Sequence, residues 1–195
     1  MMLPWMSPHA VVLSAFEETF LPREGSAWYC VCDAAVSPHL AAALRGGEGG
    51  ALCLFSPQAT LRLAEVAPWV APLPRHGDAQ RILGHVWGSG AVWVLRSSLD
   101  LSELRAHLRA LMRPKEEPLQ LLRIYDPRIL GALLKSSTSA ELGQIFEGLN
   151  EIGLEGSEPL EWERHSFDGA ALITHRSPAR WLRPRDTPER LAFAE

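Results

Sequence analysis

The segment LLRIYDPRIL, residues 121–130, brings two guanidiniums, a phenol and a carboxylate into a run otherwise made of Leu and Ile. Asp126 carries a group able to accept a proton, and Arg128 carries one able to hold an anion. The same guanidinium also suits bidentate contacts with a carboxylate of another protein. Three interpretations are therefore open: a catalytic cluster, a structural joint, or a surface bound by a partner.

The residue preferences of helix starts favour a structural joint as the role of Asp126 and Pro127. Asp is a preferred helix N-cap, and Pro fits the first helical position because its missing N–H has no partner there. We therefore predict a strand that ends at Tyr125, with Arg123 and Tyr125 on one face, and a helix that begins at Pro127. Arg128 then meets the positive end of the helix dipole, so it needs a compensating partner, which is Asp126, another nearby carboxylate or an acidic group on another protein.

Other possible reaction centres are weak. The GGEGG run at 46–50 follows a helix and precedes a strand, the reverse of a phosphate-binding loop. The seven histidines show no HxH, HxxxH or HExxH spacing, so we expect no metal site and no cofactor. We expect a protein that is not an enzyme. The alternative is a small hydrolase or transferase with a dispersed site that uses Asp126, Arg128, His107 or Ser97.

Composition limits the partners. With 195 residues, 47% of them hydrophobic, the chain can bury a sizeable core, which we expect to include its three cysteines, Cys30, Cys32 and Cys53. A net charge of −4 argues against nucleic acid as the partner. The basic residues are nearly all Arg, which favours protein partners. No basic leader and no run of about 20 apolar residues is seen, so we expect a cytoplasmic protein without a membrane partner.

The elements that must position these residues predict an α+β fold. Apolar runs at 28–32, 51–55 and 91–95 read as buried strands, and helices are expected from Ser37, Asp78 and Asp100. These make an N-terminal α/β lobe, residues 1–113, with a mixed sheet flanked by helices. After an exposed linker near 113–118, residues 119–195 form a smaller C-terminal lobe, with helices near 127–135 and 138–147 and a β-hairpin turning at Asp168-Gly169.

Two more surfaces are candidates for binding. On the helix from Asp100, three basic side chains lie away from the apolar stripe and form either a solvated face or a docking surface: Arg105, His107 and Arg109. Near the C-terminus, Trp181 and Arg183 stand among further arginines, the residue types enriched at interface hot spots. A solvated tail is the alternative there.

Five motifs in order carry a family resemblance: WYCVCDAA, ALCLF, VAPWVAPL, VLRSSLDLSELRAHLRALM and LLRIYDPRIL. Together they resemble the bacterial adaptor proteins of type VI secretion, known as domain of unknown function 4123. The resemblance covers about residues 28–135, and Ala67-Pro68-Trp69-Val70 departs conservatively from the usual segment. The family's motif residues would be Arg123, Tyr125, Asp126, Pro127 and Arg128.

The resemblance implies a non-enzymatic adaptor or chaperone. Such a protein binds a secreted effector, a toxin, and helps load it onto the valine-glycine repeat (VgrG) spike protein. An immunity-type protein that neutralises a toxin is a further alternative, and it would differ by abolishing the toxin's activity in a purified mixture.

Overall fold

The structure is a computed structural model, and it describes residues 16, 18–21, 23–47, 50–74, 77–113, 121–157 and 161–179. The statements below concern these residues. Among them, no helix has the length and apolar character needed to cross a membrane.

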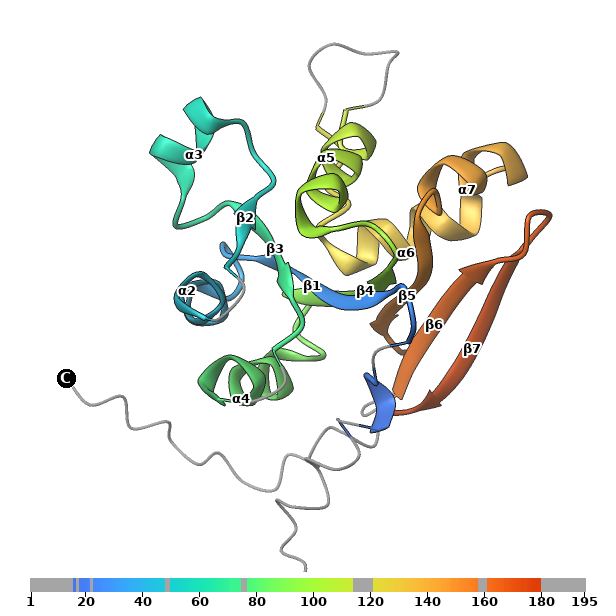
Figure 1. Ribbon diagram of the computed structural model, residues 1–195, viewed down its shortest axis with the longest axis horizontal. Helices are drawn as coiled ribbons and strands as arrows, with labels where there is room; N and C mark the ends of the chain where they lie inside the picture. Colours follow the sequence, from blue (N-terminus) through green and yellow to red (C-terminus); the bar gives the residue numbers. More distant parts are fainter. Residues whose placement is uncertain are drawn as a thin grey trace, which may run out of the picture.

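A single seven-stranded sheet with the order β2-β3-β1-β4-β5-β6-β7 forms the centre of the fold (Figure 1). Every pair of neighbouring strands is antiparallel. The strands are β1 (Ala27–Asp33), β2 (Leu52–Cys53), β3 (Pro68–Pro72), β4 (Val92–Ser97), β5 (Leu149–Glu155), β6 (Glu161–Phe167) and β7 (Leu172–Pro178). The predicted α+β class is confirmed.

The predicted mixed sheet is wrong, and the strand order explains the error. β1 is joined to β2 through a helix, as in a parallel β-α-β unit, but β3 lies between them and pairs antiparallel with both. In the same way β1 lies between β3 and β4. This is the split β-α-β arrangement, which produces the strand-helix-strand sequence of a parallel sheet without any parallel pair.

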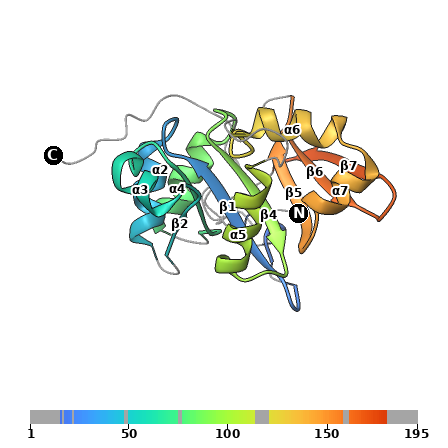
Figure 2. The same cartoon turned by 90° about the horizontal axis from the view of Figure 1, so that it is seen from above.

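Helices cover both faces of the sheet (Figures 1 and 2). One face packs on α2 (Pro38–Gly46) and α4 (Gly77–Val86) through Trp28, Cys30, Cys32, Leu40, Leu44 and Leu83. The other face packs on α5 (Leu101–Leu111), α6 (Pro127–Ser136) and α7 (Ser139–Ile145) through Val31, Trp93, Leu95, Leu104, Leu130 and Ile152. The three cysteines are free and buried, as expected, and burial raises the pKa of Cys30 to about 12.

The helix starts follow the predicted capping rules. Ser37 accepts a hydrogen bond from the Leu40 N–H ahead of α2. Asp100 and Glu103 form a complete capping box at α5. Both helices after residue 126 are confirmed within one or two residues of their predicted ends.

Three elements were not predicted, and one of them is β5. β3 begins and ends on proline, so its run of PWVAP did not read as a strand. It nevertheless pairs with β1 over five residues. The short helix α3 (Pro57–Leu63) has no buried residue and leaves Leu61 89% exposed, so it has no apolar stripe to reveal it.

The predicted strand before Tyr125 is wrong. Instead of pairing with the sheet, residues 121–126 close two tight turns, in which the N–H of Ile124 donates to Leu122 and that of Asp126 donates to Arg123. Ile124 and Tyr125 are therefore both buried rather than on opposite faces of a strand.

The predicted hairpin is present as β6 and β7, but its connection is four residues, 168–171, rather than two. The Asp168 carboxylate closes this loop by accepting from the N–H groups of Ala170 and Ala171. The predicted linker lies almost wholly outside the described residues, and the sheet continues across that boundary from β4 to β5. The division into two lobes stays a prediction.

Gly153 tests how tightly this continuous sheet is packed. A Cβ atom on Gly153 would lie 2.8 Å from Val94 and 2.9 Å from Trp162, on the strands either side of β5. We expect Gly153→Ala to lower the free energy of unfolding by about 1–3 kcal/mol in chemical denaturation. Gly84→Ala, on an open face of α4, is the control and should raise it by about 0.5–1 kcal/mol. Equal stability of the Gly153 variant and the wild type would contradict the packing.

Candidate functional site

The motif residues gather at one end of the sheet, where β1 and β5 finish and α6 begins. Asp33 is the last residue of β1, Glu155 is the last residue of β5, and Asp126 is the N-cap of α6. The loop before β4 joins them, because the Asp33 N–H donates to Ala91 O at 2.8 Å and the Gly90 N–H donates to the Glu155 carboxylate at 3.0 Å. We call this group of residues the motif end of the sheet.

Asp126, Pro127 and Arg128 form a closed joint. The Asp126 carboxylate accepts from the Arg128 backbone N–H at 3.0 Å, as a helix cap does. It also accepts two hydrogen bonds from the Arg128 guanidinium, at 2.9 and 2.7 Å. The predicted carboxylate partner of Arg128 is thus Asp126, which removes the conflict between this cation and the helix dipole.

Arg123 makes a second pair with a carboxylate that the sequence reading did not assign to the site. Its guanidinium lies 3.6 Å from the Asp33 carboxylate and stacks over the Tyr125 ring, with 5.4 Å to the ring centre. Asp33 also accepts from the backbone N–H of Ala35 at 3.0 Å. The turn between β1 and α2 is therefore tied to the turn that precedes α6.

Glu155 supplies the third carboxylate. Both of its oxygens accept from the Gly90 N–H, and the Arg128 side chain covers the same glycine. Gly90 has a φ of 75°, and the nearest Arg128 atom would be 3.6 Å from an added Cβ. A glycine is favoured here because other residues rarely adopt this backbone conformation.

The three carboxyls of the motif end have divergent pKa values. The hydrogen bonds from Arg128 hold the pKa of Asp126 below its usual range. Burial raises the pKa of Asp33, which outweighs Arg123 beside it, and burial also raises the pKa of Glu155. Asp33 and Asp126 are buried and Glu155 is half-buried, so their charges depend on the arginines beside them.

Arg123 and Arg128 face solvent although each pairs with a buried aspartate. The Arg123 and Arg128 side chains are 56% and 75% exposed, whereas those of Asp33 and Asp126 are 2% and 7% exposed. A guanidinium with one edge on a buried carboxylate keeps its remaining donors and its planar face available. Arg123 and Arg128 thus make internal ion pairs and are also exposed to solvent.

An open groove adjoins the motif end. It measures about 430 Å³ and runs between α6, the end of β5 and the first residues of β6, along Arg128, Gly131, Lys135, Leu154 and Glu163. The buried Glu163 carboxylate pairs with Lys135 at 3.0 Å and with Arg176 at 2.8 Å. The groove therefore has the same arrangement as the two aspartates, in which exposed cations pair with a buried carboxylate.

The other predicted site residues lie elsewhere. On α5, Arg105 donates to the carbonyls of Cys53 and Phe55, and His107 Nε2 donates to the Ile145 carbonyl, so both side chains link α5 to its neighbours. Arg109 is half-buried on the same helix. Trp181 and Arg183 lie outside the described residues.

Of the residues of the dispersed enzyme site, Asp126 and Arg128 are in contact, whereas Ser97 and His107 make their contacts elsewhere. Ser97 pairs with Ala27, at the opposite end of β1 from Asp33, and its hydroxyl donates to Gly148 O at 2.7 Å. His107 lies on α5, away from the joint that holds Asp126 and Arg128. Among the described residues, no group of three or more His, Cys, Asp and Glu is placed to hold a metal ion.

Fold and site together define a small α+β domain whose charged surface stands on buried carboxylates. The chain belongs to the family described as a domain of unknown function, DUF4123, which matches residues 28–144. This match includes β1 to β4, the motif end except Glu155, and α6. No curated protein and no solved structure matches the chain.

Sequence reasoning found Arg123, Tyr125, Asp126 and Arg128 but missed their partners Asp33 and Glu155. Asp33 carried a signal, because it is the one charged residue in the apolar run that ends β1. Glu155 carried none, since it lies in a strand with one other acid, Glu151, and only the pairing of β5 with β4 brings it to Gly90.

The joint predicts that loss of Asp126 and loss of Arg128 lower the free energy of unfolding by different amounts. Asp126→Ala removes the helix cap and the ion-pair partner of Arg128, so we expect it to lower the free energy of unfolding by about 1 kcal/mol or more at pH 7. Arg128→Ala should cost less, because the guanidinium is mostly solvated. Chemical denaturation of both variants measures the two losses, and a larger loss for Arg128→Ala would contradict the account.

The Asp126 carboxylate also makes the stability of the protein depend on pH. Because folding lowers the pKa of Asp126, its stabilising effect is complete above the unfolded value of about 3.9 and is lost as pH falls through the folded value. The difference between wild type and Asp126→Asn should therefore shrink below about pH 4. A constant difference from pH 7 to pH 3 would show that the charge of Asp126 plays no part.

Proposed function

We propose that this chain is a non-enzymatic adaptor or chaperone of type VI secretion in the bacterial cytoplasm. It binds a secreted effector and helps load that effector onto the VgrG spike protein. The motif end of the sheet, with the groove beside it, is the surface proposed to contact one of these two partners.

Family membership is the first support. The match to residues 28–144 includes all five residues of the motif in 123–128. The resemblance of the ordered motifs to type VI adaptors then supplies the proposed role, and it brings no catalytic residues with it.

The single observation that carries the proposal is the exposure of the motif arginines. A joint needed only for folding could bury Arg123 and Arg128 or replace them, since the cap and the proline already start α6. Instead both guanidiniums lie in solvent over buried carboxylates that fix their positions. Positioned arginines cost less entropy to bind than free ones, and arginine is enriched at interface hot spots.

Co-expression tests the proposal directly. The chain should co-purify with one candidate effector and with one VgrG protein of the source bacterium, and the effector should remain toxic when released from the complex. Failure of the folded chain to bind any of these proteins would overturn the adaptor role. Loss of toxin activity in the purified mixture would instead support the immunity-type alternative.

Variants of the motif end sharpen this test. In Arg123→Gln with Arg128→Gln, the amide groups can still hydrogen bond to the carboxylates, so we expect a folded protein that loses one of its two partners. Arg62→Gln is the matched control, because Arg62 is an exposed arginine on α3. Unchanged binding of both partners by the double variant would exclude the motif end as a contact surface.

A further inference from the structure

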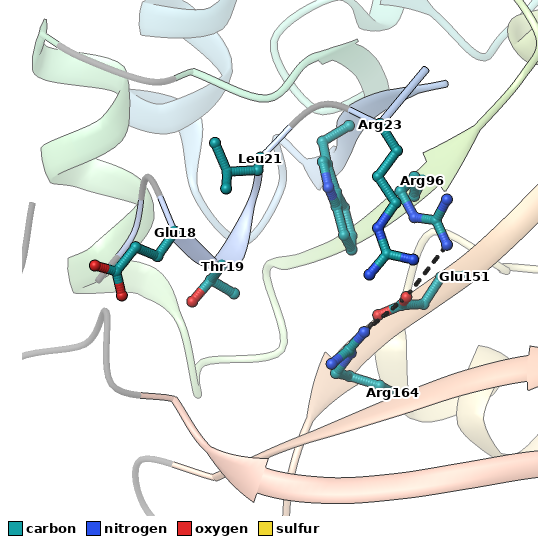
Figure 3. Close-up of a pocket in the computed structure, with 8 residues that line it drawn as sticks. Glu18, Thr19, Leu21, Arg23, Arg96, Glu151 and Arg164 are labelled. Carbon is teal, nitrogen blue, oxygen red and sulfur yellow. Dashed lines mark hydrogen bonds and ion pairs between the residues drawn. The ribbon is translucent and has the colours of Figure 1, made fainter. Parts of the chain in front are cut away.

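We propose that a recess at the opposite end of the sheet binds an acidic segment of a partner protein through Arg23, Arg96 and Arg164. The inference rests on the proposed function and deepens it by naming the chemistry of one partner. The recess measures about 260 Å³ and lies between the chain segment before β1 and strands β4 to β6 (Figure 3).

Strand register brings the three guanidiniums together. Arg96 on β4 lies directly opposite Glu151 on β5, and Arg164 on β6 lies opposite Gly153, two residues further on. Residues two apart on a strand point to the same face, so Glu151 stands between both arginines. Arg23 reaches the same point from the segment before β1, as Figure 3 shows.

A single carboxylate serves this cluster. Glu151 is buried, with a side chain 8% exposed, and it accepts two hydrogen bonds from the Arg164 guanidinium, one of them at 2.8 Å. Arg96 is held less closely, 3.6 Å from Glu151 and 3.4 Å from the Ser26 hydroxyl. Within the described part of the chain, the guanidinium of Arg23 has no ion-pair or hydrogen-bond partner. Glu18 lies across the recess and points away from the arginines (Figure 3).

The recess therefore carries an excess of positive charge. Three guanidiniums face one carboxylate, and Arg96 is only 14% exposed, so its charge is poorly hydrated. Arg96 and Arg164 share the Glu151 carboxylate, and cations that share one counterion repel each other unless a further anion binds. An added carboxylate would accept from Arg23 and Arg96, the two groups that Glu151 does not saturate.

Size and surroundings favour a carboxylate on a peptide. About 260 Å³ is below the usual range for a drug-sized ligand, roughly 300–1,000 Å³, but it can hold an acidic side chain. Leu21, 59% exposed at the rim, offers an apolar contact for a neighbouring residue of the same segment. The chain's net charge of −4 disfavours nucleic acid as the source of the anion.

The position of the recess fits a protein that holds two partners. Trp28 lines the recess, whereas Asp33 lies at the motif end, five residues along β1. At about 3.3 Å per residue the two sites are roughly 17 Å apart along the strand. Two partners can therefore bind at opposite ends of the sheet.

A defined peptide pair tests the recess in the purified protein. The probes are acetyl-Glu-Leu-Glu-Leu-Glu-amide and the same peptide with Gln in place of Glu, titrated at low salt while the arginine Nε–H signals are followed by NMR. We expect the acidic peptide to shift the signals of Arg23, Arg96 and Arg164, and the Gln peptide to leave them unchanged. No shift with the acidic peptide, or shifts confined to Arg123 and Arg128, would overturn the proposal.

Arg23→Gln is the decisive variant, because Arg23 is exposed and its loss leaves the Glu151 pairs in place. It should weaken binding of the acidic peptide by about tenfold, the loss of one charge-assisted contact, while Arg62→Gln should not change it. Equal affinity of the Arg23 variant and wild type would overturn the assignment. Tighter binding of a single-stranded oligonucleotide than of the peptide, with the same loss in the variant, would also overturn it.

The outcome can be separated from that of the proposed function. If effector and spike both co-purify with the Arg23 variant as well as with wild type, the recess assignment fails and the adaptor role stands. If neither partner binds wild type but the acidic peptide does, the adaptor role fails and the recess remains an acidic-peptide site.

Discussion

A carboxylate buried at the end of a sheet must be paired or hydrogen-bonded, and this constraint organises the molecule. Asp33, Asp126 and Glu155 meet where β1 and β5 end and α6 begins, and each is held by backbone N–H groups together with an arginine or its field. Asp33 and Asp126 are buried and Glu155 is half-buried, while the arginines that pair with the two aspartates lie at the surface. Pairing with these acids fixes the positions of two guanidiniums, and folding alone does not require that they face solvent.

A buried acid paired with two cations recurs along the sheet. Glu163 is held by Lys135 and Arg176 in the groove, and Glu151 is held by Arg164 and Arg96 in the recess. Chains with few lysines can build such surfaces, since the guanidinium fork binds a carboxylate along one edge and leaves its other donors free. The proposed adaptor thus has charged surfaces set by strand register rather than by mobile side chains.

The sequence predicted what depends on neighbours along the chain. The caps at Ser37, Asp100 and Asp126, the two helices after residue 126 and the burial of the cysteines all follow from local rules. It did not predict what depends on strand order. Pairings between distant segments produce the antiparallel sheet, the proline-flanked strand β3 and the contact of Glu155 with Gly90. Hydrophobic periodicity along the chain does not predict such pairings. The sequence therefore identified Arg123, Arg128 and the cap Asp126, but it did not identify Asp33 and Glu155 as part of the site.

The central claim is that the motif end of the sheet contacts a partner. Hydrogen–deuterium exchange of the chain, alone and in complex with a co-purified effector or VgrG protein, tests it most directly. The account predicts slower exchange in the complex at 121–136 and 154–157, with little change on α2. Protection confined to α2 and α4, with 121–136 unchanged in both complexes, would contradict it.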